Sequence, residues 1–190
     1  MLPSMAPRRG SPRRLTAEDW IEAGFAVLAE GGPNALRVDS LCERLNVTKG
    51  SFYWHFTDMP AYRGALIKAW SGLHDRDRQH FETMPDVNPR ERLTVMIQTW
   101  VAPRHWQLER AMRVWALTDD EVLGSVQQSD ARVLRAVRQA FVDVGFGREE
   151  AALRSYVVFA LGIGSLHSSG SAPATAPDLQ DRFLDFMLRP

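Results

Sequence analysis

The feature that most constrains this chain is a three-residue connection between two short helical segments. Before it, the apolar residues Val38, Leu41 and Leu45 recur three and four positions apart, which is the spacing of one helix face. Asn46 tolerates the left-handed conformation that ends a helix, and Thr48 is a residue type that begins one. The sequence therefore predicts two short helices joined by a tight turn, which is the pattern of a helix-turn-helix motif.

The rest of the chain after residue 15 shows the same helical periodicity and no alternating strand pattern. We expect a first helix that begins after Thr16 and ends at "GGPN", and a long fourth helix that begins at Asp58 and runs to about residue 84. Further helices are expected at about 89–102, 103–117, 119–146, 148–169 and 178–189, with a break in the 119–146 helix near Gln128.

These elements predict an all-α chain with about nine or ten helices. We divide it into a basic flexible arm at residues 1–14, a helix-turn-helix bundle of three helices at 15–58, and a larger helical domain at 59–190. The arm contains Arg8, Arg9, Arg13 and Arg14 and no acidic residue, although the net charge of the whole chain is zero. The arm is either a DNA contact or a solubilising tail.

Composition excludes several classes of protein. The single cysteine, Cys42, excludes an internal disulfide and a paired-cysteine metal site, and we expect it to be buried and inert. The N-terminus lacks an apolar leader, and the longest strongly apolar run, Val157 to Leu166, is about half the length of a membrane span. We find no catalytic triad order, phosphate loop or metal cluster. The chain is expected to be cytoplasmic, to carry no cofactor and not to be an enzyme.

The segment "VTKGSFYWHF", residues 47–56, combines four aromatic residues with small polar ones and a lysine. Phe52 and Phe56 are four positions apart, so they would share the inward face of a short helix. The outward side would then carry polar-tipped residues that suit nucleic acid: Lys49, Ser51, Tyr53, Trp54 and His55. The alternative is a surface helix that is simply held in place by its aromatic residues.

Residues 15–70, "LTAEDWIEAGFAVLAEGGPNALRVDSLCERLNVTKGSFYWHFTDMPAYRGALIKAW", resemble the DNA-binding region of the TetR family of transcriptional regulators. The resemblance is most specific at "LCERLNVTKGSFYWHF", where cap, turn, glycine and aromatic positions agree together. It implies a three-helix bundle followed by a long fourth helix. The remaining 120 or so residues are similar only in being helical throughout.

The resemblance also implies which residues contact DNA. Positions that usually touch phosphates are occupied by Thr48, Lys49, Ser51, Tyr53 and His55, and base contacts are implied for Lys49, Gly50 and Trp54. Arg37 stands where the family often has a capping threonine, so it would lose a cap and add a phosphate contact. Asp39 stands where a basic or neutral residue is common in the family, so its charge would oppose DNA if it faces the backbone. Met59 replaces a lysine that is frequent at the start of the fourth helix, which puts one phosphate contact in doubt. Arg13 and Arg14 in the arm are further candidates.

Family membership implies an effector site in the C-terminal domain. One helix face and a nearby tryptophan supply the candidates: Trp100, His105, Leu108, Met112 and Trp115. A pocket of this composition suits a small hydrophobic or aromatic effector with one polar handle. A plain hydrophobic core is the alternative. Glu109 lies four positions from both His105 and Arg113, which surface ion pairing explains better than a metal site.

The helix at 148–169 is apolar all round in its second half and so needs cover on both sides. In the family the two C-terminal helices pack against those of a second subunit. We therefore expect a homodimer that buries Phe159, Gly162, Ile163, Leu166, Phe183, Phe186 and Met187. The predicted function is a regulator, most simply a repressor, released from a palindromic double-stranded DNA operator by a small molecule. The alternative is a helix-turn-helix regulator controlled by a protein partner.

Overall fold

The computed structural model describes residues 14–82, 88–101, 106–168 and 177–189. Within these ranges the regular structure is entirely helical, so the all-α prediction is confirmed. The elements are α1 Ala17–Gly31, the 3-10 turn η1 Pro33–Ala35, α2 Val38–Leu45, α3 Lys49–His55, α4 Met59–Glu82, α5 Pro89–Val101, α6 Trp106–Trp115, α7 Asp120–Val144, α8 Arg148–Ser168 and α9 Pro177–Met187.

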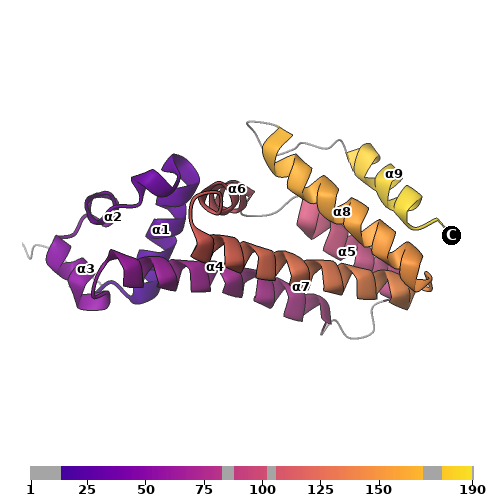
Figure 1. Ribbon diagram of the computed structural model, residues 1–190, viewed down its shortest axis with the longest axis horizontal. Helices are drawn as coiled ribbons and strands as arrows, with labels where there is room; N and C mark the ends of the chain where they lie inside the picture. The colour runs from indigo at the N-terminus through magenta and orange to yellow at the C-terminus, as the bar shows by residue number, and fades with distance from the viewer. Residues whose placement is uncertain (1–13, 83–87, 102–105, 169–176, 190) are drawn as a thin grey trace, which may run out of the picture.

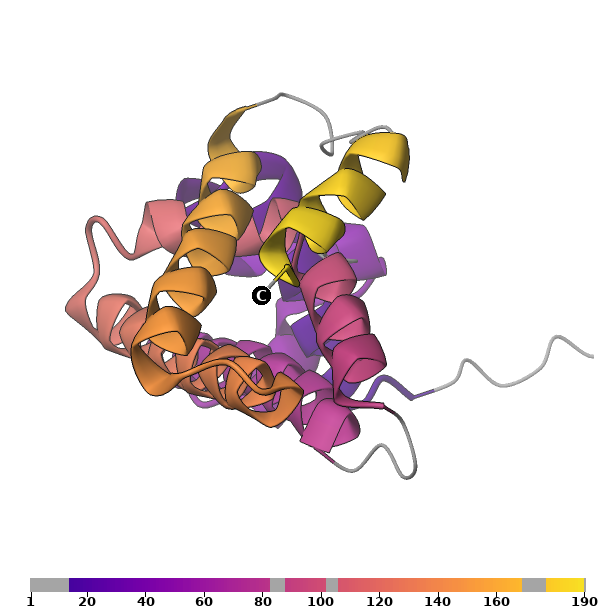
Figure 2. The same cartoon turned by 90° about the vertical axis from the view of Figure 1, so that its right-hand side faces the viewer.

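The molecule is elongated, with α3 at one end and α5, α8 and α9 at the other (Figure 1). The two long helices α4 and α7 run side by side along the molecule and join these ends. The short helix α6 lies between the two ends of the molecule and contacts α1, α7 and α8. Figure 2 looks onto the far end, where α7 packs against both α5 and α8, and α5 packs against α9. None of the described helices is long and apolar enough to cross a membrane.

The local signals that position the helix-turn-helix act largely as the sequence predicts. Thr16 forms a reciprocal capping box with Asp19 at the start of α1. Asn46 ends α2 in the left-handed conformation, with φ of 53°. The carboxylate of Asp58 accepts a hydrogen bond of 2.7 Å from the backbone N–H of Ala61 and so caps α4. Thr48 occupies the N-cap position of α3 in extended geometry, but its side chain makes no capping hydrogen bond.

The predicted break near Gln128 is wrong, because α7 is continuous from Asp120 to Val144. Val122, Val126 and Ser129 are buried at spacings of four and three, so the inward face of the helix passes Gln128 without interruption. Gln128 itself is exposed and is a good helix former, which gives the backbone no reason to break.

Two hydrophobic clusters form the core. The first joins α1, α2, α3 and the first part of α4 to α6 and the first part of α7. The second joins α5, the second half of α7, α8 and α9. The first cluster includes Trp115 and Val122, so it extends well beyond residue 58, where we placed the end of the helix-turn-helix bundle. A displacement of α6 would therefore directly disturb the packing of the helices against which α3 lies.

Candidate nucleic-acid interface

The turn between α2 and α3 is held by backbone hydrogen bonds. The N–H groups of Asn46 and Val47 donate to the carbonyls of Glu43 and Cys42 at 3.1 and 3.0 Å, which closes the end of α2. Ser51 N–H donates to the carbonyl of Thr48 at 3.0 Å and opens α3. The direction of α3 relative to α2 is therefore set by the backbone of three residues, as the sequence predicts.

Aromatic packing fixes the rotation of α3 about its own axis. Phe52 is fully buried, and its ring meets Trp20 of α1 and Tyr62 of α4 edge to face, with centroids 5.4 Å apart in both pairs. Phe56 packs on Tyr62 at 4.9 Å. The two phenylalanines therefore face inward, as predicted from their spacing.

Tyr62 also connects α4 to α1 through a hydrogen bond that the sequence did not predict. Its hydroxyl donates a buried hydrogen bond of 2.7 Å to the carbonyl oxygen of Trp20, and burial raises the pKa of this phenol above its usual range. A Cβ on Gly24 would stand only 2.0 Å from the hydroxyl oxygen. The glycine is thus required by the close approach of α1 and α4, a signal that appears only when both helices are placed.

The outward side of α3 carries large exposed rings. Trp54 is 71 % exposed and Tyr53 is 56 % exposed, which places both in solvent as predicted. His55 differs because it is partly buried rather than exposed. The centre of its ring lies 6.4 Å from those of Trp20 and Phe56. The expectation that His55 points fully outward is corrected, because the end of α3 turns its seventh residue back toward α1.

The polar positions at the start of α3 remain open to solvent. Thr48, Lys49 and Gly50 are exposed, and Ser51 is half-buried. A Cβ placed on Gly50 would meet only the Thr48 hydroxyl oxygen at 3.7 Å, an ordinary contact. Packing within the described chain therefore does not explain a glycine at this exposed helical position.

Lys49 is not a free cation in this structure. Its Nζ lies 2.6 Å from a carboxylate oxygen of Asp39 in the first turn of α2. The hydrogen bond to this carboxylate raises the pKa of Lys49. Cys42 is buried next to this pair, and burial raises the pKa of its thiol, in agreement with an inert cysteine.

Two further arginines border this surface. Arg37 stands at the N-cap position of α2 without making a side-chain cap, and its Nε donates to the Asn34 carbonyl at 3.2 Å. The guanidinium carbon of Arg14 lies 4.7 Å from the centre of the exposed Trp54 ring, a cation–π geometry. Arg13 and the rest of the arm lie outside the described residues.

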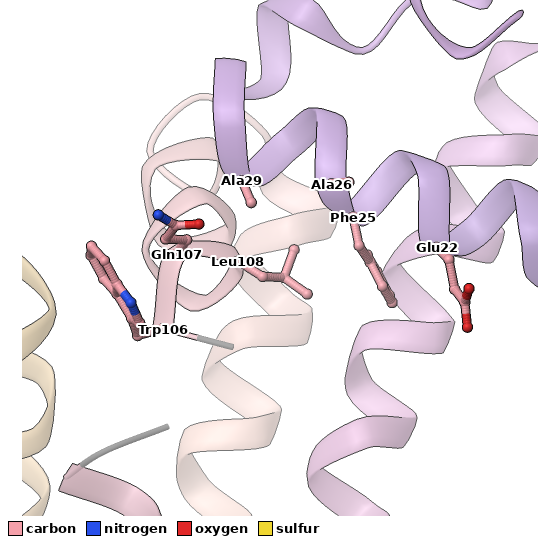
Figure 3. A pocket seen from close by; sticks show the side chains of 7 residues that line it. All are labelled: Glu22, Phe25, Ala26, Ala29, Trp106, Gln107 and Leu108. Carbon is pink, nitrogen blue, oxygen red and sulfur yellow. The ribbon is translucent and has the colours of Figure 1, made fainter. Parts of the chain in front are cut away.

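The residues predicted for an effector pocket do not gather around one described cavity. Leu108, Met112 and Trp115 are all buried in the first hydrophobic cluster, as the core alternative predicts. His105 and the side chain of Trp100 lie outside the described residues. Beside this cluster, α1 and α6 form the walls of an open groove of about 390 Å³ (Figure 3). The groove is lined by Glu22, Phe25, Ala26, Ala29, Trp106, Gln107 and Leu108.

Glu109 also differs from the prediction of surface ion pairs along α6. It is buried, and its carboxylate accepts a hydrogen bond of 2.7 Å from the indole N–H of Trp70 on α4. Arg113 instead makes a two-pronged pair with Asp130 of α7, at 2.7 and 2.9 Å. Helical spacing alone pairs neighbours four apart, whereas these partners come from other helices.

Among the described residues, no group of three or more His, Cys, Asp or Glu side chains is placed to hold a metal ion.

The seven residues predicted for a dimer interface fall into three groups. Gly162, Leu166 and Met187 are buried within the chain itself, so they have little surface to offer a second subunit. Phe159, Ile163 and Phe183 are half-buried, and Phe186 is exposed. The predicted interface did not include the large apolar residues that α8 exposes to solvent: Leu153, Tyr156, Val157 and Leu161. They were missed because a helix that is apolar all round does not reveal which side its own chain covers.

Comparison with known proteins agrees with this architecture. Residues 21–61 match the model of "Bacterial regulatory proteins, tetR family". The transcriptional regulator AcuR of Cereibacter sphaeroides is 38 % identical over 69 residues, which cover 34 % of this chain and 32 % of AcuR. A protein of Escherichia coli K12 named "Probable acrEF/envCD operon repressor" is 26 % identical over 147 residues, or 72 % of this chain and 66 % of that protein. Each match thus spans less than two thirds of the curated relative.

Solved structures share the fold over a greater length. One of them, described as a transcriptional regulator from Saccharomonospora viridis in complex with choline, superposes with a TM-score of 0.70 at 16 % identity and covers 90 % of this chain and 94 % of that one. The helix-turn-helix geometry, the match at residues 21–61 and the shared all-helical fold point to one conclusion. Residues 21–61 carry the DNA-binding region of the TetR family of bacterial regulatory proteins, and the chain as a whole shares the fold of solved regulators.

Proposed function

We propose that this protein is a dimeric transcriptional repressor that binds a palindromic DNA operator through α3 and is released by a small molecule. The observation that carries the proposal is the division of α3 into two sides. Phe52 is fully buried against α1 and α4, while Lys49, Tyr53 and Trp54 stand in solvent on a helix whose rotation is fixed. A rigid helix that presents a cation and flat polar-tipped rings suits the major groove of DNA.

The roles proposed for individual residues follow from their positions. Thr48, Ser51 and Tyr53 contact phosphates, and Arg37 and Arg14 flank them on the same surface. Lys49 and Trp54 reach base edges, and the exposed Gly50 lets the backbone approach the duplex. His55 contributes less than the sequence suggests, because it is only partly exposed to solvent. Arg13, which precedes Arg14 in the sequence, is a further proposed DNA contact.

The exposed apolar face of α8 supports the homodimer. Leu153, Tyr156, Val157 and Leu161 stand in solvent together with Phe186 of α9. A second copy would cover them at the end of the molecule opposite α3 (Figure 1). In such a dimer two copies of α3 enter successive major grooves, about 34–36 Å apart, which explains a palindromic operator. We thus assign DNA binding to residues 15–58, with the basic arm before it, and effector binding and dimerisation to 59–190.

The groove between α1 and α6 supports the proposed response to a small molecule. Phe25 and Leu108 face each other across it, with Glu22 toward one end and Trp106 toward the other (Figure 3). An occupant would touch α1, which carries the DNA-binding bundle, and α6, which contacts α7 and α8. A small hydrophobic or aromatic effector bound more tightly in one arrangement of these helices would shift the distance between the two α3 helices.

The effector claim is tested by screening small compounds for a rise in melting temperature and then measuring operator affinity with each one that binds. Choline belongs in the screen because the groove offers two aromatic rings and a carboxylate, the groups that hold organic cations. A compound that binds and lowers operator affinity supports the proposal. If every compound that binds leaves operator affinity unchanged, control by a protein partner replaces it.

DNA binding is tested by selecting bound duplexes from a random pool and measuring their affinity by fluorescence anisotropy. We expect a palindromic sequence to be enriched, and Lys49→Ala to weaken binding to it. If the lysine contacts backbone, the slope of log K against log salt should also fall by about 0.9. Lys68→Ala is a suitable control, because this exposed lysine lies on α4 outside the α2–α3 surface. Failure to retain any duplex at low salt would contradict the proposed function.

A further inference from the structure

Lys49 and Asp39 form a pair on the surface proposed to meet DNA. The lysine is the first residue of α3, and the aspartate lies in the first turn of α2. Their charged atoms are 2.6 Å apart, yet the side chains remain 62 % and 73 % exposed. The carboxylate thus occupies, on the protein itself, the place that a phosphate oxygen would take beside this ammonium group.

Two properties of this pair make it exchangeable. Both side chains are open to water, and exposed ion pairs are weak because solvent and salt screen them. Lys49 also has a long flexible stem, so its ammonium group can leave Asp39 and reach DNA without any movement of α2 or α3. A phosphate that takes Lys49 leaves the Asp39 carboxylate uncompensated close to the DNA backbone. A contact between Lys49 and a phosphate therefore costs binding free energy, because the Asp39 carboxylate loses its partner and repels the DNA backbone.

We infer that Asp39 is a specificity-determining residue, an internal anion that competes with DNA phosphates for Lys49. The inference rests on the proposed function of α3. Binding to non-cognate DNA depends almost entirely on phosphate contacts, so it bears the whole penalty. At a cognate site Lys49 can instead donate to the acceptors of a guanine edge, and Asp39 can accept from the amino group of a cytosine. Asp39 thus lowers non-specific affinity more than operator affinity.

The chain contains a matched control pair. Glu30 of α1 and Arg44 of α2 form a two-pronged ion pair at 2.7 and 2.8 Å, and neither residue belongs to α3. Glu30→Gln and Asp39→Asn each remove one negative charge and one exposed ion pair from the same bundle. Only Asp39→Asn releases a cation of α3. A general effect of net charge would appear equally in both variants, whereas competition for Lys49 would appear in one.

The test measures anisotropy of a labelled 30-base-pair duplex of scrambled sequence between 50 and 200 mM KCl, with the full-length protein. Asp39→Asn should steepen the salt slope by about 0.9, the effect of one added phosphate contact, so its gain in affinity over the natural protein should be roughly threefold larger at 50 mM than at 200 mM. Glu30→Gln should give no comparable change, and Asp39→Glu, which keeps the charge, should behave like the natural protein. In a Lys49→Ala background the effect of Asp39→Asn should largely disappear.

Three results would overturn the inference: an unchanged slope in Asp39→Asn, an equal change in Glu30→Gln, or an undiminished effect when Lys49 is absent. Thermal unfolding of each variant checks that α2 and α3 remain folded. These outcomes are separate from failure of the proposed function, which would appear as absence of duplex binding by the natural protein. If the protein binds duplex and Asp39→Asn has no effect, only the role of Asp39 is lost.

Discussion

Two exposed surfaces at opposite ends of the molecule, one on α3 and one on α8, differ in chemistry. On α3 the exposed rings of Tyr53 and Trp54 have polar tips and lie next to Lys49 and Arg14. On α8 the exposed side chains of Val157 and Leu161 lie in a stretch, residues 155–166, that contains no charged residue. Aromatic rings with cations suit a charged, hydrogen-bonding partner such as DNA, whereas an uncharged apolar face suits another protein surface.

The supports of the two surfaces also differ. Behind the exposed face of α3 lies a group of interlocked rings centred on Phe52, with a buried hydrogen bond from Tyr62 to the Trp20 carbonyl. Behind the exposed face of α8 lies a cluster of mainly aliphatic side chains from α5, α7 and α9. The first arrangement fixes the orientation of a helix of seven residues, which has too few contacts of its own to remain in place.

Phe52→Ala should have the largest effect. Removing this fully buried ring leaves a cavity between α1, α3 and α4, and we expect the free energy of unfolding to fall by about 3–5 kcal/mol. Chemical denaturation checks this value. Tyr53→Ala is the control, because the neighbouring ring is mostly exposed and its loss should cost less than about 1 kcal/mol. Equal losses for the two variants would contradict the division of α3 into an inward and an outward side.

Much of this division was predictable from the sequence, because it depends on local rules. Phe52 and Phe56 are four residues apart, and Asn46 and Asp58 are recognisable end signals, so the inward face of α3 and its limits followed directly. The Tyr62 hydrogen bond, the Gly24 contact and the pairing of Lys49 with Asp39 were not predictable in the same way. Each one depends on how two separate helices approach each other, which periodicity within one helix does not determine.

The same limit explains the errors further along the chain. Glu109 was expected to pair on the surface of α6, but its partner Trp70 comes from α4, 39 residues away. The covered side of α8 was also not predictable, since Val158 and Leu161 are equally apolar but only Val158 is buried. A helix with apolar residues on every side requires knowledge of its neighbours before its free face can be identified.

A double substitution on α8, Val157→Asp with Leu161→Asp, should have the next largest effect. Two carboxylates on the proposed subunit interface would prevent its burial, and we expect a monomer at micromolar concentration in light scattering. Operator affinity should fall about 100-fold or more, because the two α3 helices no longer bind as one unit. Leu117→Asp is the control, since Leu117 is 81 % exposed on a different surface. A dimer that persists in the double variant would exclude this face as the interface.

Trp54→Ala should have the smallest effect of the three and should separate the two surfaces most clearly. Trp54 is exposed, so its removal should leave both the free energy of unfolding and the dimer unchanged. Loss of its ring removes a base contact and the stacking surface for Arg14, so the free energy of operator binding should weaken by about 1–3 kcal/mol.

The matched substitution on α8 is Tyr156→Ala, which removes a similarly exposed ring. It should weaken the dimer but leave operator affinity unchanged at protein concentrations where the dimer still forms. If Trp54→Ala instead weakens the dimer, or Tyr156→Ala lowers the operator affinity of the intact dimer, the chemical difference between the two surfaces does not correspond to a difference in partner.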